Sequence, residues 1–170
     1  MTTEDGTPRS LRLPLVGASF STAIVRFFRK YVDFGGRASR SEYWWVVLAL
    51  TLASFAVQIA ADVADGPTPR GSESTIDFAL PFVPGIGVPA VGLDSPWGVV
   101  ASLLALAVLL PSLSLSWRRL HDTDRSGWWY LIVLIPVVGW IAMLIFMLQA
   151  PRPEGARFDR RSDERPIAPR

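Results

Sequence analysis

Three long apolar runs constrain the fold of this chain more than any other feature. They cover about residues 43–61, 97–117 and 128–149. Each has close to the ~20 residues that an α-helix needs to cross the roughly 30 Å of hydrocarbon in a bilayer. Half of all residues are hydrophobic, and only 19% are charged. The sequence therefore predicts an all-α membrane protein with three hydrophobic transmembrane segments.

The segments around these runs differ in composition. Residues 1–20 contain scattered prolines and arginines and predict a flexible tail, and the arginine- and proline-rich residues 151–170 predict a disordered one. Residues 21–150 form a single predicted membrane domain. Residues 62–96 form a long connection, and because prolines and glycines interrupt its apolar second half, residues 78–93, we expect an interfacial or re-entrant loop there.

Residues 21–33 have the periodicity of an amphipathic helix at the N-terminal side of the first run. The apolar residues fall at i, i+3, i+4 and i+7, namely Ile24, Phe27, Phe28 and Tyr31, whereas the charged residues fall elsewhere. Such a helix can lie in the headgroup plane as an interfacial helix, or it can pack on the other segments. The sequence favours neither arrangement.

A capping box precedes the first apolar run. In Ser39-x-x-Glu42 the serine hydroxyl can accept from the backbone N–H three residues on, and Glu42 can reach back to the backbone of Ser39. We therefore expect a helix to begin here. Small residues that predict a helix-packing face recur along the run: Ala49, Ala53, Ala56 and Ala60.

Positive charge is distributed unevenly between the polar segments. Five cations lie within residues 21–42, one arginine lies in the first loop, and three lie in the strip over residues 117–127. This bias predicts that the N-terminus and the strip lie on the cytoplasmic side and that the first loop lies outside. The six arginines after the third run do not fit this orientation, since three full crossings place them outside.

Two topologies are open for the third run. Residues 128–149 can cross the membrane once as a kinked helix, with the tail translocated despite its arginines. Alternatively, the chain can enter the membrane and turn back at residues 136–139, which keeps every arginine cluster inside. We favour the kinked crossing, because the run has the length of one span and a turn exposed to lipid is costly.

The strip over residues 117–127 holds three arginines, two aspartates and the only histidine. Its arginines can bind lipid phosphates through their guanidinium forks, or they can act only as anchors at the cytoplasmic face. His121 beside Asp122 is compatible with an interfacial enzyme. A lone histidine in a chain without cysteine does not supply a set of metal ligands, so we expect no metal, no cofactor and no catalysis.

Three motifs, in order along the chain, resemble the signatures of one family. They are residues 31–45 (YVDFGGRASRSEYWW), 118–129 (RRLHDTDRSGWW) and 135–140 (IPVVGW). The sequence resembles, over roughly residues 27–158, the small bacterial inner-membrane proteins catalogued as domain of unknown function 805. That family often closes on an Asn-Arg-aromatic-Gly element, where this chain has ARFD at residues 156–159. The resemblance implies a compact integral protein of the bacterial inner (plasma) membrane, without an assigned activity.

Few polar groups lie within the apolar runs, which argues against a pump or a coupled transporter. No phosphate-binding loop or serine nucleophile motif is present. The sequence therefore favours a non-enzymatic membrane scaffold or interaction protein. A small transporter or channel component is the first alternative, and an interfacial enzyme acting on lipid headgroups is the second.

The expected partners are membrane lipids with anionic headgroups, a second copy of the chain or another membrane protein, and not nucleic acid. The residues predicted to bind them flank the first two runs. We name them the basic juxtamembrane set: Arg37, Arg40, Glu42, Arg118, Arg119, His121, Asp122 and Arg125.

Overall fold

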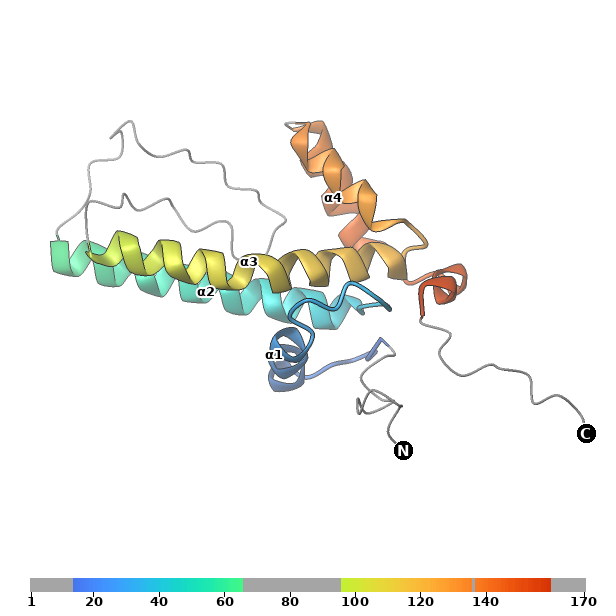
Figure 1. Ribbon diagram of the computed structural model, residues 1–170, viewed down its shortest axis with the longest axis horizontal. Coiled ribbons are helices and arrows are strands. Elements are labelled where there is room, and N and C mark those ends of the chain that lie inside the picture. Colours follow the sequence, from blue (N-terminus) through green and yellow to red (C-terminus); the bar gives the residue numbers. More distant parts are fainter. Residues whose placement is uncertain (1–13, 66–95, 136, 160–170) are drawn as a thin grey trace, which may run out of the picture.

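The computed structural model describes residues 14–65, 96–135 and 137–159. Every regular element in those ranges is helical: α1 (Phe20–Arg29), α2 (Arg40–Asp65), α3 (Pro96–Asp122), η2 (Gly127–Leu134), α4 (Val138–Leu148) and η3 (Pro153–Phe158). α2 and α3 lie side by side as a long pair, and the other elements gather where α2 begins and α3 ends (Figure 1). The predictions for residues 1–13, 66–95 and 160–170 lie outside the described ranges.

α2 and α3 contain the first two predicted spans and are both long and apolar enough to cross a bilayer. Their 26 and 27 residues correspond to about 40 Å each, against roughly 30 Å of hydrocarbon. Large apolar side chains stand exposed on both helices, among them Leu52, Phe55 and Leu103, each about 60% exposed. Exposed apolar surface on this scale suits lipid rather than water.

The start of α2 has one of the two hydrogen bonds of the predicted capping box. The backbone N–H of Glu42 donates to the Ser39 hydroxyl at 3.2 Å, as predicted. The Glu42 carboxylate does not reach back to the cap. It instead accepts from Arg26 of α1 at 2.8 Å, because a buried guanidinium needs a counter-ion more than an N-terminal N–H needs a second acceptor.

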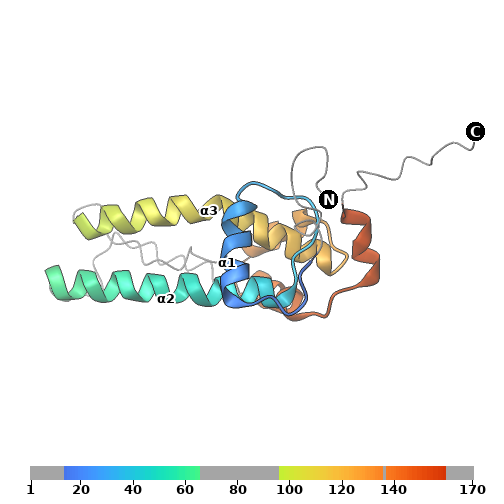
Figure 2. The same ribbon diagram turned by 90° about the horizontal axis from the view of Figure 1, so that it is seen from below.

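α1 packs on α2 and α3 and runs across both of them (Figure 2). Its buried face consists of Ala23, Arg26 and Phe27, whereas Phe28 is 54% exposed. The predicted apolar face was therefore wrong in part, since it included Phe28 and placed Arg26 elsewhere. Of the two arrangements left open, the structure has the helix packed on the other segments.

Proline 111 lies inside α3 without ending the helix. A proline removes the N–H that would bond to the carbonyl four residues earlier, which here belongs to Ala107. The hydroxyl of Tyr31, in the loop after α1, donates to this carbonyl. Ser114 does not repair the helix, because its hydroxyl contacts the carbonyls of Lys30 and Asp33 at 3.1 and 2.6 Å.

Two members of the alanine stripe of α2 do not lie on the face that packs on α3. Ala53 and Ala56 are exposed, whereas Ala49 and Ala60 are half-buried. The core side of the helix is lined by Val46, which is fully buried, and by Val47, which packs against the same cluster. The larger Val46 and Val47 thus contribute to the core side of α2, and the predicted packing face was wrong for Ala53 and Ala56.

The third apolar run is not one helix. It forms η2, with eight residues, and α4, with eleven, in place of the kinked helix expected over residues 128–149. Gly139 is close to the backbone of Ile132, since a Cβ at Gly139 would lie 1.8 Å from the Ile132 carbonyl oxygen. η2 and α4 thus pack on each other as a hairpin, and α4 leaves the line of α3 (Figure 1).

Both ends of this hairpin lie beside the end of α3. The first end follows α3 directly, because η2 begins at Gly127 against the ring of Trp117. The second end returns, because Arg119 donates to the Gln149 carbonyl and Arg125 donates to the Gln149 side-chain oxygen at 2.6 Å. Contacts between distant residues, rather than the local sequence, produce this return.

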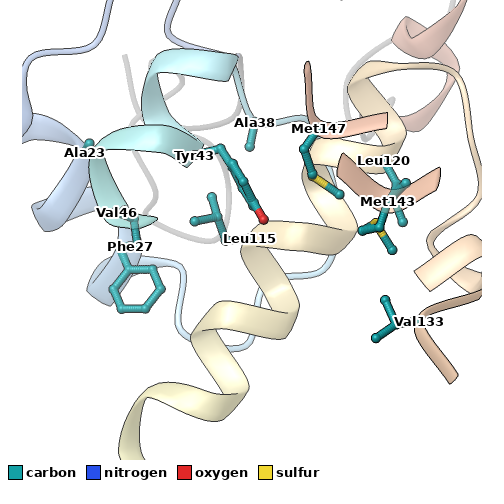
Figure 3. Close-up of a cluster of buried hydrophobic side chains, with 10 residues drawn as sticks. All are labelled: Ala23, Phe27, Ala38, Tyr43, Val46, Leu115, Leu120, Val133, Met143 and Met147. Carbon is teal, nitrogen blue, oxygen red and sulfur yellow. The ribbon is translucent and has the colours of Figure 1, made fainter. Parts of the chain in front are cut away.

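The core lies at the same end of the helix pair. α1, α2, α3, η2 and α4 all contribute buried side chains to it, and Tyr43 extends from α2 toward α3 (Figure 3). The members are Ala23, Phe27, Ala38, Tyr43, Val46, Leu115, Leu120, Val133, Met143 and Met147. The molecule is therefore most tightly packed at one end, next to the polar strip.

Candidate functional site

All cations of the described residues lie at one end of the α2–α3 pair, where α2 begins and α3 ends. We call this the charged end. Its members are Arg26, Arg29, Lys30, Arg37, Arg40, Arg118, Arg119, Arg125, Arg152 and Arg157. Some of these side chains are buried in ion pairs and others reach the surface, and the two groups have different roles.

The innermost group surrounds Glu42. Its Oε1 lies 2.8 Å from Arg26 Nε and 3.8 Å from an Arg118 terminal nitrogen, and all three side chains are almost completely buried. The three guanidinium nitrogens of Arg118 have no hydrogen-bond partner among the described residues. Lys30 is buried nearby, and this burial, together with repulsion from Arg118 and Arg26, lowers its pKa to about 8. Positive charge thus exceeds negative charge in this part of the interior.

A second group ties α4 to α3. Arg119 pairs with Asp122 one turn further along α3, and both side chains are almost fully buried. Arg119 also donates to the backbone carbonyls of Met147, at 3.0 Å, and Gln149. These carbonyls belong to the C-terminal end of α4, where a helix lacks internal donors and favours positive charge. Arg119 therefore fixes the returning end of the hairpin.

A third group holds η3 on α3. Arg37 donates to both carboxylate oxygens of Asp159, with a shortest distance of 2.7 Å, and lies 4.0 Å from Oδ1 of Asp122. A Cβ at Gly155 would lie 2.4 Å from the His121 carbonyl oxygen, so only glycine permits this close approach. The prediction of disorder from residue 151 was therefore wrong for residues 151–159, since these contacts hold the segment against α3.

His121 has a structural role in this arrangement. Its Nδ1 lies 3.1 Å from the Gly36 carbonyl oxygen, and its ring stacks on Phe158 with a centroid distance of 4.1 Å. The Gly36 N–H in turn donates to the Phe158 carbonyl at 3.1 Å, and Gly36 has a φ of 77°, which favours glycine. Within the part of the chain that the structure describes, no cluster of three or more His, Cys, Asp or Glu side chains forms a candidate metal site.

The structure thus brings the basic juxtamembrane set together, but mostly in the interior. The buried members are Glu42, Arg118, Arg119, His121 and Asp122. Of the remainder, Arg40 is exposed, Arg37 and Arg125 are partly buried, and the Arg125 guanidinium lies 4.1 Å from the centre of the Phe146 ring. A set that was predicted to form a surface is largely an internal ion-pair network.

Sequence reasoning missed Arg26 and Lys30 as buried cations, and Phe158 and Asp159 as partners of the strip. One local signal was present, because Ala23, Arg26 and Phe27 are spaced as one helix face. The pairing of Arg26 with Glu42 spans 16 residues, and that of Arg37 with Asp159 spans 122. No periodicity carries information over such separations.

Comparisons with known proteins give the following similarities. Residues 31–160 match the family described as "Protein of unknown function (DUF805)". The inner membrane protein YhaH of Escherichia coli strain K12 is 32% identical over 134 residues, which are 79% of this chain and 90% of YhaH. The inner membrane protein YhaI of the same strain is 34% identical over 118 residues, which are 69% of this chain and 75% of YhaI. No solved structure matches this chain significantly.

Proposed function

This chain belongs to the DUF805 family of proteins of unknown function, and from that premise we propose that it is a non-enzymatic, multi-pass inner-membrane protein that binds anionic lipids at its charged end. The observation that carries the proposal is the gathering of every described cation at that end, beside helices that expose many large apolar side chains. Anionic lipids of the cytoplasmic leaflet attract such cations with about 1 kcal/mol each near the surface.

The exposed arginines are the ones available to lipid. They are Arg29 on α1, Arg40 at the start of α2, and Arg152 and Arg157 around η3. The side chain of Arg157 remains 61% exposed although it pairs with Asp124 at 3.0 Å. Buried Arg118 and Arg119 serve the proposed function indirectly, by holding the elements that carry the exposed cations.

The proposal includes a topology with two complete crossings, by α2 and α3. The eleven residues of α4 reach only about 16 Å, which is half of the hydrocarbon thickness. The η2–α4 hairpin would then enter the membrane from the cytoplasmic side and return to it. Trp128 and Trp129, which are 69% and 51% exposed, would lie at the interface, as tryptophans commonly do.

This topology places the N-terminal segment, the strip and the C-terminal tail on one side. It removes the disagreement between the six tail arginines and the other cations, since all of them then face the cytoplasm. α1, which crosses the helix pair, would run along the same membrane face (Figure 2).

Lipid analysis of the extracted protein tests the proposed function. The chain is extracted from bacterial membranes in polymer-bounded nanodiscs, and the lipids that co-purify are quantified against the bulk membrane. We expect enrichment of anionic lipids, and a weaker enrichment when Arg29, Arg152 and Arg157 are all replaced by glutamine. The matched control is Glu154→Gln, which alters an exposed carboxylate of η3. A lipid composition equal to that of the bulk membrane would contradict the proposal.

A further inference from the structure

We propose that the charged end contains a specific site for one phosphatidylglycerol-type lipid, with its phosphate on Arg40, a headgroup hydroxyl on Asp122 and an acyl chain along α2. This inference rests on the proposed function and deepens it, because it names one lipid class and one position. It follows from two adjoining cavities and from the unsatisfied polar groups around them.

The two cavities differ in character and meet at Arg40 and Ser41. The first, which we call the polar cavity after its charged side chains, has a volume of about 340 Å³ and is lined by Arg37, Ser39, Arg40, Ser41 and Asp122 together with Pro14, Val16, Gly17 and Pro151. The apolar cavity has a volume of about 520 Å³ and is lined by Arg40, Ser41, Trp44, Trp45, Leu48 and Leu148. A phospholipid has the same division, with a polar headgroup that continues into an apolar chain.

The apolar cavity follows one face of α2 toward the membrane. Arg40, Trp44 and Leu48 succeed one another at intervals of four residues, which places them on one side of the helix. Leu148 at the end of α4 forms the opposite wall, and Leu48 and Leu148 are 43% and 52% exposed. Because this wall is open and apolar, an acyl chain from the surrounding bilayer can enter it directly.

Arg40 is available for a phosphate. Its one hydrogen bond is a long one, 3.4 Å, to the Leu148 carbonyl, and no carboxylate lies within 4.0 Å of it among the described residues. It occupies the first position of α2, where the helix dipole favours negative charge. The guanidinium fork fits a phosphodiester. Ser41 lies on the same wall, where its hydroxyl accepts from the Ala18 N–H at 3.0 Å.

Asp122 decides which headgroup fits. It lines the polar cavity, is 1% exposed, and its Oδ1 has no hydrogen-bond donor among the described residues. A buried carboxylate oxygen without a donor is rare, so a headgroup donor would satisfy it. Arg119 and Arg37 already lie on either side of this carboxylate, at 2.5 and 4.0 Å. They would repel an ammonium group but not a neutral hydroxyl.

Charge balance favours the same lipid. Arg37, Arg40 and Arg119 contribute three positive charges around the polar cavity, against the two carboxylates Asp122 and Asp159. A phosphatidylglycerol headgroup carries one negative charge and free hydroxyls, so it neutralises the excess. Phosphatidylethanolamine is zwitterionic, which leaves the excess in place.

Native mass spectrometry of the purified full-length chain tests the site. The protein is titrated with phosphatidylglycerol and, separately, with phosphatidylethanolamine of the same acyl chains. We expect one saturable phosphatidylglycerol, bound about tenfold more tightly than phosphatidylethanolamine. Arg40→Gln should remove this preference, and Glu154→Gln, which alters an exposed carboxylate of η3, should retain it. Leu48→Trp, which fills the apolar cavity without a change of charge, should weaken binding of both lipids.

The outcomes separate the site from the general proposal. If Arg40→Gln retains the preference, or if phosphatidylethanolamine binds as tightly in the wild type, the site is overturned. Enrichment of anionic lipid in nanodiscs without a saturable phosphatidylglycerol overturns the site and leaves the proposed function intact. Loss of both contradicts the proposed function as well. Circular dichroism of each variant confirms that it remains folded, and Leu48→Trp provides a test that is independent of charge.

Discussion

At the scale of single residues, the ion pairs around Glu42 connect three elements of the fold. Glu42 lies on α2, its closest partner Arg26 lies on α1, and Arg118 lies on α3. Burying two guanidinium groups is costly unless a counter-ion accompanies them. The stability of this end of the molecule therefore depends strongly on one carboxylate.

Glu42→Gln should destabilise the protein by about 3 kcal/mol, because it leaves Arg26 and Arg118 buried without their carboxylate. Thermal unfolding in a mild detergent measures the change. The control Glu154→Gln removes an exposed carboxylate and should have little effect. Equal melting temperatures for the two variants would show that the ion pairs do not stabilise the fold.

The burial of Lys30 predicts that the free energy of unfolding rises with pH in mildly alkaline solution. Burial, with the added repulsion of Arg118 and Arg26, lowers its pKa from 10.5 to about 8 despite the attraction of Glu42 and Asp33. Between about pH 8 and pH 10.5 the unfolded chain therefore binds more protons than the folded one. Stability should rise over this window by about 1 kcal/mol per pH unit.

Chemical denaturation across that pH range measures this effect. In Lys30→Met the group that titrates is absent, so its contribution to the slope should disappear. If the free energy of unfolding of the wild type changes with pH as little as that of Lys30→Met, the burial of a charged lysine at this position is contradicted.

The sequence identified some of these residues but not their partners. Ser39 caps α2 as its motif predicts, since the cap involves atoms only three residues apart. Arg118 and Asp122 were identified because they lie in a strip dense in charged residues, and they were predicted to lie on the surface. Whether a charge is buried depends on which distant segment covers it, and here η3 and the loop before α2 cover the strip.

At the scale of elements, the sequence predicted α2 and α3 because length and composition suffice for a membrane helix. The same criterion failed for the third run, whose length is also that of one span. The run is divided into two helices that approach closely at Gly139 and the Ile132 backbone. Its end lies beside α3 because Arg119 donates to the Met147 carbonyl at the end of α4. The first contact joins residues seven positions apart and the second joins residues 28 apart, so run length alone predicted one helix where the structure has two.

Gly139→Ala should open the η2–α4 hairpin. The new Cβ would lie 1.8 Å from the Ile132 carbonyl oxygen, which is a backbone atom and cannot move aside as a side chain can. We expect a loss of about 2 kcal/mol in stability, measured by thermal unfolding. The control on the same helix is Val138→Ala, which shortens a 64% exposed side chain and should change little. A variant Gly139→Ala as stable as this control would contradict the packed hairpin.

At the scale of the whole molecule, charge is segregated along the long axis. The cations of the described residues occupy one end, and large apolar side chains stand exposed along the α2–α3 pair beyond it. The sequence predicted the segregation from its arginine counts but left the C-terminal tail on the opposite side. The proposed hairpin topology would remove that exception, and it rests on the return of the chain to Arg119.

The measurement that tests the account most directly is the side of the membrane on which each end of the hairpin lies. The chain has no native cysteine, so single cysteines can replace Ser72 in the first loop, Ser126 before η2 and Ala156 in η3. Each variant is treated in intact cells with a membrane-impermeant maleimide. The account predicts labelling at Ser72→Cys, and protection of Ser126→Cys and Ala156→Cys until the cells are permeabilised. Labelling of Ala156→Cys together with protection of Ser126→Cys would show a third crossing and contradict the account.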